Sequence, residues 1–321
     1  MKRKPIVIAH RGACGYLPEH TIAGKALAFA MGTDFVELDA VLTKDDRAIV
    51  FHDHYLNAMT DVADVFPGKK RKDGKFYAVD FTLEEIKELT IHERLHPDTG
   101  NAVYPGRFPK GSRINFGIPT LEEEIALVQG LNRSMRKDVG IYIEPKGPAY
   151  HRGEGKCIED VVLDILKRYG YSSRDSRCYI QSFEPDSIRY MRNDLKSDLT
   201  MVQLIGDNTW EETPGVDYYR MMTPEGLDEV ARYADLIGPW MNQIAVDEGK
   251  GREPMLTKLV AWAHERNMEV HPYTFRADAL PSYAGSFDDL LEIFFVTISV
   301  DGVFTDFPDK VNDFLIRSGL R

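Results

Sequence analysis

The sequence predicts an α/β protein of the (β/α)8 TIM-barrel class, with a small insertion after a β-hairpin that follows the second strand. Short β-like apolar runs alternate along the chain with segments of helical periodicity. Several of these runs end abruptly in charged or imidazole side chains, as buried strands do where they emerge at the mouth of a barrel. The 321 residues are enough for one large α/β core, and we find no linker, repeat or low-complexity tract.

The expected strands are short runs of mainly apolar, β-branched and aromatic residues bounded by polar or turn-forming residues. Their number and their alternation with helical segments predict one closed parallel barrel. The expected barrel strands cover residues 6–9, 34–38, 139–144, 177–182, 200–205, 235–238, 269–274 and 302–305.

The helices between these strands are indicated by apolar residues at helical spacing and by capping signals. Thr21 precedes an Ala-rich segment that ends at Gly32, and Thr120 and Glu123 have the spacing of a capping box. The expected helices cover residues 21–31, 82–89, a segment that begins at Thr120, and residues 156–169, 185–195, 224–233, 255–266 and 287–296.

The connection after the second strand differs from the others because no helical segment follows it. Residues 43–47 are polar and predict a turn, and residues 48–51 return as a strand, so the two strands form a β-hairpin. The hairpin turns the chain back and brings His52 beside the carboxylates of the second strand.

The segment from 54 to about 118 lacks the alternating pattern of the rest of the chain. It is rich in Asp, Lys, Gly and Pro. A structureless loop of this length would be unusual in a compact domain. We therefore expect a small subdomain inserted into a single barrel domain that spans residues 1–321.

The composition excludes several classes of protein. The formal net charge of −11 argues against binding to nucleic acid or to an anionic membrane surface, and no apolar run approaches the length of a membrane span. The N-terminus has no signal-peptide pattern, so we expect a cytoplasmic protein as written, or a periplasmic one if this is a trimmed mature chain. The sequence sets no oligomeric state.

Three carboxylates are candidates for a metal site. Glu37 and Asp39 lie two residues apart on a strand and share a face, and Glu144 ends the next barrel strand. Buried carboxylates this close repel each other unless a cation lies between them. An oxygen cage suits Ca²⁺, or else Mg²⁺, better than a soft metal. Ion pairs with Arg or Lys at the barrel mouth are the alternative.

Two histidines are the candidate general acid and base. His10 and His52 both end strands and should lie near the three carboxylates, whereas a single histidine at a strand end is more often structural. Arg11 and Lys146 are the candidate phosphate-binding cations. Gln181 would bind a substrate hydroxyl or form an interior hydrogen bond, and Tyr273 would pack or form an aromatic wall.

These residues resemble the glycerophosphodiester phosphodiesterase family, over nearly the whole chain and in the family's order and spacing. The subgroup that it resembles is the long bacterial one. The motifs are His10-Arg-Gly12, Pro18-Glu-His-Thr21, Glu37-Leu-Asp39, Thr43-Lys-Asp45, His52-Asp53, Tyr104-Pro-Gly-Arg-Phe-Pro109, Glu144-Pro-Lys146, Gln181-Ser-Phe183, His271-Pro-Tyr-Thr274 and Thr305-Asp-Phe-Pro308.

The resemblance implies a barrel with an insertion after the His52 strand and catalytic histidines at His10 and His52. It also implies a divalent metal, commonly Ca²⁺, on the three matching carboxylates. Pro145 departs from the aliphatic residue usual between the last of these carboxylates and Lys146. The implied reaction is hydrolysis of a deacylated phospholipid to glycerol 3-phosphate and an alcohol.

Two other functions are also compatible with a barrel of this kind. A related barrel lyase of the phospholipase D type would stop at a cyclic phosphate. A non-catalytic surface-binding protein on the same barrel would show an anchor or damaged site residues, and the sequence shows neither.

Overall fold

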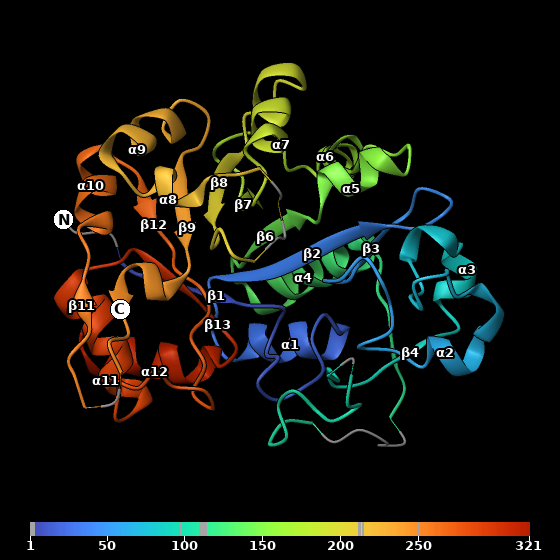
Figure 1. The fold of residues 1–321 in the computed structure, drawn as a ribbon, viewed down its shortest axis with the longest axis horizontal. Helices are drawn as coiled ribbons and strands as arrows, with labels where there is room; N and C mark the ends of the chain where they lie inside the picture. The colour runs from blue at the N-terminus through green and yellow to red at the C-terminus, as the bar shows by residue number, and fades with distance from the viewer. Residues whose placement is uncertain (1–3, 97, 109–113, 211–212, 214, 250) are drawn as a thin grey trace.

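The structure is a computed structural model that describes residues 4–96, 98–108, 114–210, 213, 215–249 and 251–321. Pro109, the last residue of one family motif, lies outside this range. Within the described residues, eight parallel strands follow one another in the order β12-β9-β8-β7-β6-β2-β1-β13, with helices around them (Figure 1). The strands are β1 (Ile6–Ala9), β2 (Phe35–Leu42), β6 (Gly140–Pro145), β7 (Cys178–Ser182), β8 (Thr200–Ile205), β9 (Leu236–Pro239), β12 (Glu269–Val270) and β13 (Gly302–Thr305).

The barrel is closed between its two end strands by backbone hydrogen bonds. Asp301 donates to Val270 at 3.1 Å, and Phe275 donates to Phe304 at 2.8 Å. Phe275 and Thr305 also form a parallel bridge beyond the ends of β12 and β13. The predicted (β/α)8 barrel is therefore confirmed, although the seventh strand, expected over residues 269–274, is regular only at Glu269–Val270.

The helices mostly follow the expected segments. Thr21 accepts a hydrogen bond from the N–H of Gly24, and Thr120 forms the predicted capping box with Glu123. Two π-helical turns, Tyr190–Asp194 and Ile293–Ile298, continue α7 and α11. The helices are α1 (Ile22–Ala30), α2 (Val62–Val65), α3 (Leu83–Ile86), α4 (Leu121–Met135), α5 (Pro148–Gly153), α6 (Ile158–Arg168), α7 (Pro185–Arg189), α8 (Tyr218–Met221), α9 (Pro224–Val230), α10 (Leu259–Glu265), α11 (Phe287–Glu292) and α12 (Pro308–Arg317).

One expected helix was wrong at its start, and other elements were not predicted. Residues 255–266 were expected to be helical throughout, but Met255–Leu256 form β11, which pairs with β10 (Ala245–Val246), and α10 begins only at Leu259. Met255 and Leu256 are exposed, so their hydrophobicity does not mark the buried face of a helix. Helices α5 and α12 were not predicted either.

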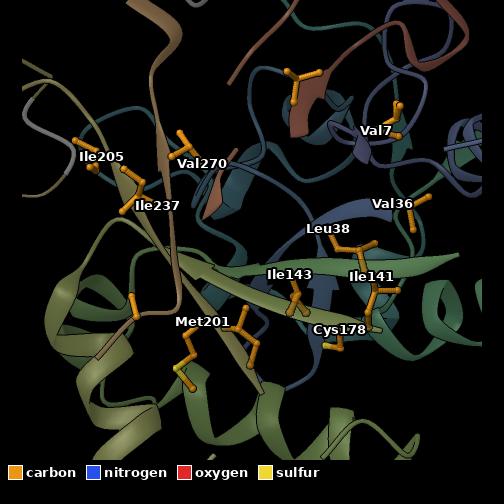
Figure 2. Close-up of a cluster of buried hydrophobic side chains, with 14 of the residues drawn as sticks. Val7, Val36, Leu38, Ile141, Ile143, Cys178, Met201, Ile205, Ile237 and Val270 are labelled. Carbon is orange, nitrogen blue, oxygen red and sulfur yellow. The ribbon is translucent and has the colours of Figure 1, made fainter. Parts of the chain in front are cut away.

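Side-chain alternation along the strands separates two apolar regions. One face of each strand packs against the surrounding helices, where Val36, Leu38, Ile141 and Ile143 belong to the main core (Figure 2). The opposite face points into the barrel. The part of the barrel interior that lies farther from the mouth is filled by a second cluster of large side chains: Ile8, Phe35, Tyr142, Val202, Leu236 and Phe304. The barrel interior is thus closed at one end and polar at the other.

The hairpin and the segment after it form a third apolar cluster. β3 (Ala48–Val50) pairs antiparallel with β2, as predicted. Val41, Ile49 and Phe51 pack with buried residues of segment 54–118, which include Phe81 and Ile118. The inserted segment also contains α2, α3 and the short paired strands β4 (Thr90–Ile91) and β5 (Phe116–Gly117), and it lies to one side of the barrel (Figure 1).

None of the helices in the described residues combines the length and hydrophobicity that a membrane crossing requires. Cys14, Cys157 and Cys178 are free thiols. Two of them, Cys14 and Cys178, are buried, and burial raises the pKa of the Cys178 thiol.

The capping box at the start of α4 gives a first testable prediction. Replacing Thr120 by Ala removes the acceptor for the N–H of Glu123, which now lies 3.1 Å from the Thr120 hydroxyl oxygen. We expect the free energy of unfolding to fall by about 1 kcal/mol, measured by urea denaturation. Ser134→Ala, at an exposed position in the same helix, is the control and should leave stability nearly unchanged. Equal stabilities of the two variants would contradict a role of the cap.

Candidate active site

A cavity of about 330 Å³ opens where the barrel strands end, and every predicted site residue lines it. Aromatic side chains of the strand-following loops, including Trp210 and Trp240, form part of its wall. The predicted residues that line it are His10, Arg11, Glu37, Asp39, His52, Glu144, Lys146, Gln181 and Tyr273.

Strand register brings the three carboxylates to the same end of the barrel. Residues 35, 37 and 39 of β2 share the inward face, so Phe35 fills the barrel while Glu37 and Asp39 lie progressively nearer its mouth. Asp39 is the register partner of Glu144 on the neighbouring strand β6. Parallel pairing of the two strands thus places Glu144 beside Asp39 in the backbone register.

Burial makes this carboxylate group unfavourable unless a cation neutralises it. Glu37 and Asp39 are almost fully buried, and burial together with the charge of Asp39 raises the pKa of Glu37 well above its usual range. Asp39 keeps a low pKa because the hydrogen bond from His20 and nearby positive charges outweigh its burial. The oxygen Oδ1 of Asp39 is buried and accepts no hydrogen bond from the described residues. A hard cation coordinated by oxygen fits this donor set.

His20 lies behind Asp39 and orients it. The Nε2 atom of His20 is 2.8 Å from Oδ2 of Asp39, and its Nδ1 atom is 3.3 Å from the ammonium of Lys25. Ligand atoms of His20, Glu37 and Asp39 lie within 4.8 Å of one another, and among the described residues this group does not include Glu144. His20 is therefore a geometric alternative to Glu144 as a ligand. Because both ring nitrogens of His20 already have partners, we assign it the role of holding Asp39.

Lys25 was not predicted from the sequence, where it reads as an ordinary residue of an Ala-rich helix. Its side chain is fully buried, contacts the carbonyl oxygen of Glu37 and lies 3.6 Å from the buried carboxylate of Glu124 on α4. Burial raises the pKa of Glu124 to about 7 despite this neighbour. Lys25 thus connects the helix layer to the base of the site.

We expect Lys25→Met to lower the free energy of unfolding by about 3 kcal/mol or more, because Glu124 would be left buried without a cation. The double variant Lys25→Met/Glu124→Leu should regain the part of this loss that comes from the ion pair, since an apolar pair can replace a buried ion pair. The contacts of Lys25 with the Glu37 carbonyl oxygen and with His20 remain lost in both variants. Urea denaturation measures both, with the exposed Lys167→Met as the control. A single variant as stable as the wild type would contradict the proposed pairing.

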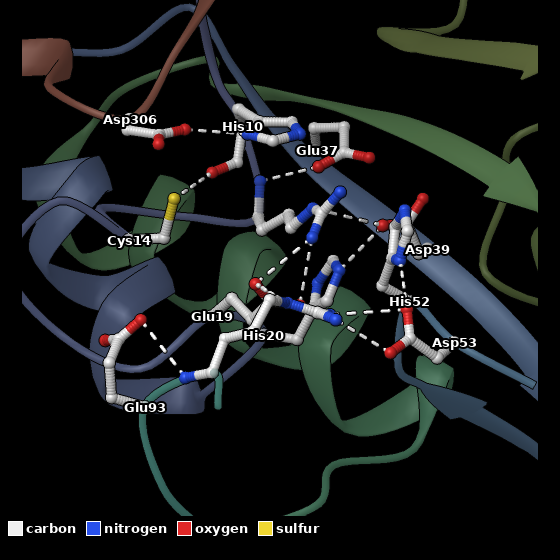
Figure 3. Close-up of polar contacts among 12 residues, drawn as sticks. His10, Cys14, Glu19, His20, Glu37, Asp39, His52, Asp53, Glu93 and Asp306 are labelled. Carbon is white, nitrogen blue, oxygen red and sulfur yellow. Dashed lines mark hydrogen bonds and ion pairs between the residues drawn. The ribbon is translucent and has the colours of Figure 1, made fainter. Parts of the chain in front are cut away.

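His10 is held in one orientation by a carboxylate from the far end of the chain. Its Nδ1 atom lies 2.7 Å from Oδ1 of Asp306, which follows β13 (Figure 3). Burial and the charge of Arg11 lower the pKa of His10 to about 4, so the imidazole is neutral at neutral pH. The ionised Asp306 accepts from Nδ1–H, and Nε2 of His10 is left with the lone pair that can take a proton.

His52 has the same arrangement with a carboxylate from its own loop. Its Nδ1 atom lies 2.6 Å from Oδ1 of Asp53, the next residue along the chain. Burial and the charges of Arg11 and Lys146 lower the pKa of His52. The site therefore contains two neutral imidazoles, each held by an aspartate through Nδ1.

Arg11 sits in a sharp turn after β1. Its backbone is left-handed, with φ at 55°, and its N–H donates to Oε2 of Glu37 at 2.5 Å. Gly12 follows at φ 92°, and a Cβ there would lie 3.0 Å from the backbone of Gly24, which explains the glycine. The Arg11 guanidinium binds both oxygens of Glu19, so Glu19 positions this cation.

Lys146, Gln181 and Tyr273 line the cavity but also have protein partners. The ammonium of Lys146 lies 3.0 Å from Oε1 of Glu144, and its backbone continues the pairing with β2 beyond Pro145. Gln181 donates to Oε1 of Glu37 at 3.3 Å, whereas its own Oε1 is buried without a donor among the described residues. The Tyr273 hydroxyl donates to the carbonyl of Ile205, which leaves its ring as the part that faces the cavity.

Several functional neighbours were missed because they come from distant parts of the chain. Arg94 and Arg107 belong to the inserted segment and bind Asp53 and Asp306. Arg276 lies 3.0 Å from Asp306 through Nε. The available signals were Asp53, which directly follows His52, and Asp306, which directly follows the last barrel strand. Nothing local indicated which arginines these carboxylates meet.

Comparison with known proteins identifies the family of this chain. Residues 10–310 match the model of the glycerophosphoryl diester phosphodiesterase family. A glycerophosphodiester phosphodiesterase of Haemophilus influenzae is 42% identical, with 98% of this chain and 91% of the relative covered. A glycerophosphodiester phosphodiesterase of Treponema pallidum is 36% identical, with 97% of this chain and 91% of the relative covered. A crystal structure from Silicibacter pomeroyi is similar, with TM-score 0.73, 26% identity, and 99% of this chain and 95% of that chain covered. The chain therefore belongs to the glycerophosphoryl diester phosphodiesterase family.

Proposed function

We propose that this enzyme hydrolyses glycerophosphodiesters to sn-glycerol 3-phosphate and an alcohol, with a divalent cation and two histidines. The observation that carries the proposal is the set of side chains that line one cavity at the barrel mouth. Two imidazoles, three carboxylates, Arg11 and Lys146 all line it. This set supplies proton transfer, metal ligation and charge compensation for a phosphodiester.

The residues that would hold the cation are Glu37, Asp39 and Glu144. Three observations support this assignment. The register of β2 and β6 places Asp39 beside Glu144, and a buried oxygen of Asp39 accepts no hydrogen bond from the described residues. Burial and the nearby charge of Asp39 raise the pKa of Glu37. Oxygen donors favour Ca²⁺, with Mg²⁺ as the second candidate. When bound, such an ion withdraws charge from the phosphate as a Lewis acid.

The protein side chains would then divide the proton transfers between them. An oxygen nucleophile bonds to phosphorus while the bond from phosphorus to the alcohol oxygen breaks. One imidazole takes the nucleophile's proton through Nε2, and the other gives a proton to the leaving alkoxide. The negative phosphodiester raises the pKa of an adjacent imidazole, which favours the protonated form that the acid requires.

Arg11 is the residue best placed to bind the phosphate. Its Nε atom is buried, makes no hydrogen bond among the described residues and lies 3.7 Å from Oδ2 of Asp39, while Glu19 holds the rest of the guanidinium in place. The arginine is therefore oriented before substrate arrives and has a donor to offer. Lys146 adds a second positive charge to the same wall.

A coupled assay for glycerol 3-phosphate, run on glycerophosphocholine, glycerophosphoethanolamine and glycerophosphoglycerol, tests the function. We expect release of glycerol 3-phosphate, with phosphorus NMR showing the monoester as the final product. A cyclic phosphate that accumulates without being opened would instead establish the lyase reaction. No turnover of any of these diesters would refute the proposed function.

A further inference from the structure

The inserted segment reaches into the active site through two arginines. Arg94 follows β4, and Arg107 lies on the loop that precedes β5. Arg107 is almost completely buried, with 4% of its side chain exposed, and Arg94 has 18% exposed. Both belong to segment 54–118, whereas His10 follows the barrel strand β1 and His52 lies just after the hairpin strand β3.

Each arginine binds the carboxylate that orients one of the two histidines. Arg94 donates to Oδ2 of Asp53 at 2.7 Å and to Oδ1 at 3.3 Å, and Oδ1 of Asp53 contacts His52 (Figure 3). Arg107 donates to Oδ2 of Asp306 at 2.6 Å. The other oxygen of that carboxylate lies 2.7 Å from Nδ1 of His10.

We propose that Arg94 and Arg107 are positioning residues for the reaction, through which the inserted segment fixes the orientation of both active-site imidazoles. This inference rests on the proposed function, because it concerns the same two histidines. A carboxylate held at one oxygen by an arginine presents its other oxygen in a fixed direction. The imidazole that donates to that oxygen is then held with Nε2 in a fixed place.

The two networks differ in how many cations hold the aspartate. Asp306 also binds Arg276, so it keeps a cation when Arg107 is removed. Within the described part of the chain, Arg94 is the cation that forms an ion pair with Asp53. Arg94 additionally binds Glu19, which holds Arg11, so it connects His52 to the phosphate-binding guanidinium. Removing Arg94 should therefore have the larger effect.

Other interactions of Arg107 fix its own side chain. Arg107 lies 3.8 Å above the ring of Tyr104, donates to Asp278 at 2.9 Å and reaches the carbonyl oxygen of Cys14. These contacts span the inserted segment, the loop after β1 and the loop after β12. Docking of the insertion and alignment of the histidines thus depend on the same side chains.

The test compares Arg94→Gln and Arg107→Gln on two substrates. One is glycerophosphocholine, whose alkoxide leaving group needs a proton from the enzyme. The other is glycerol 3-(p-nitrophenyl phosphate), whose phenolate leaves without one. We expect kcat on glycerophosphocholine to fall on the order of 10-fold or more in both variants, and more for Arg94→Gln. KM should change little in Arg107→Gln and should rise in Arg94→Gln, because Arg94 also binds the Glu19 carboxylate that holds Arg11.

In one variant, the loss of kcat should disappear on the nitrophenyl ester, and the histidine that this arginine positions is then the general acid. The other variant should keep a low kcat on both substrates. Arg94→Lys should recover part of the lost kcat. Arg71→Gln is the matched control, because Arg71 lies in the same insertion and binds Asp80 and Glu154 away from the histidines. Its turnover should be that of the wild type.

Thermal melting separates positioning from folding. If both arginine variants keep wild-type kcat on glycerophosphocholine, or lose it equally on both substrates in proportion to a fall in Tm, the inference is overturned. A wild-type enzyme that hydrolyses neither substrate would refute the proposed function instead. The two failures are therefore distinguishable.

Discussion

His10→Ala and His52→Ala are each expected to lower kcat on glycerophosphocholine by about 10²- to 10⁴-fold, the usual contribution of one general acid or base. Each variant keeps the barrel intact, because both histidines lie at its mouth and contribute little to the apolar core. KM should change much less than kcat, since substrate binding is assigned mainly to Arg11 and the metal site. Steady-state kinetics with matched circular dichroism spectra measure the effect.

The leaving group distinguishes the two histidines further. Loss of the acid is expected to be largely rescued on a nitrophenyl ester, whereas loss of the base persists on either substrate. His96→Ala, an exposed histidine in the inserted segment, is the control and should retain full activity. Wild-type turnover after removal of either His10 or His52 would exclude that residue from the chemistry.

Removal of the proposed cation is the second change with a large expected effect. Dialysis against EDTA should lower turnover on the order of 1,000-fold, because charge stabilisation by a bound metal ion contributes several kcal/mol to the transition state. Addition of Ca²⁺ should restore activity, and Mg²⁺ should restore less. Activity that persists after exhaustive chelation would remove the metal from the reaction.

Two isosteric variants connect that result to the assigned ligands. Glu37→Gln and Asp39→Asn should abolish Ca²⁺ binding as measured by calorimetry, a readout independent of activity. The metal-free Glu37→Gln protein should be at least as stable as the wild type, because burial and the charge of Asp39 already raise the pKa of Glu37. Glu88→Gln, at an exposed carboxylate, should bind Ca²⁺ normally. Normal binding by Asp39→Asn would reject this ligand set.

The strands and the polar residues at their ends could be predicted because both depend on local patterns. Glu37 and Asp39 share a face through the two-residue period of a strand, and Glu144 ends the neighbouring strand. The hairpin was predicted equally locally, from a polar turn between two apolar runs. Helix α10 was misplaced at its start because hydrophobicity alone does not separate an exposed strand pair from a buried helix face.

The partners of the histidines could not be predicted in the same way. His10 and Asp306 are 296 residues apart and meet only because β1 and β13 pair in the closed barrel. Arg94 and Arg107 reach the site only because the inserted segment docks on the barrel with its own apolar cluster. The buried contact between Lys25 and Glu124 likewise depends on how α1 packs on α4.

The sequence by itself determined the barrel, its hairpin and nine of the side chains that line the cavity, since alternation and strand order decide which residues reach the mouth. Only the tertiary structure decided which carboxylate orients each imidazole and which arginine holds that carboxylate. The physical reason is that hydrogen bonds between distant segments depend on barrel closure and on docking of the inserted segment. No local pattern of residues encodes which distant segments these two events bring together.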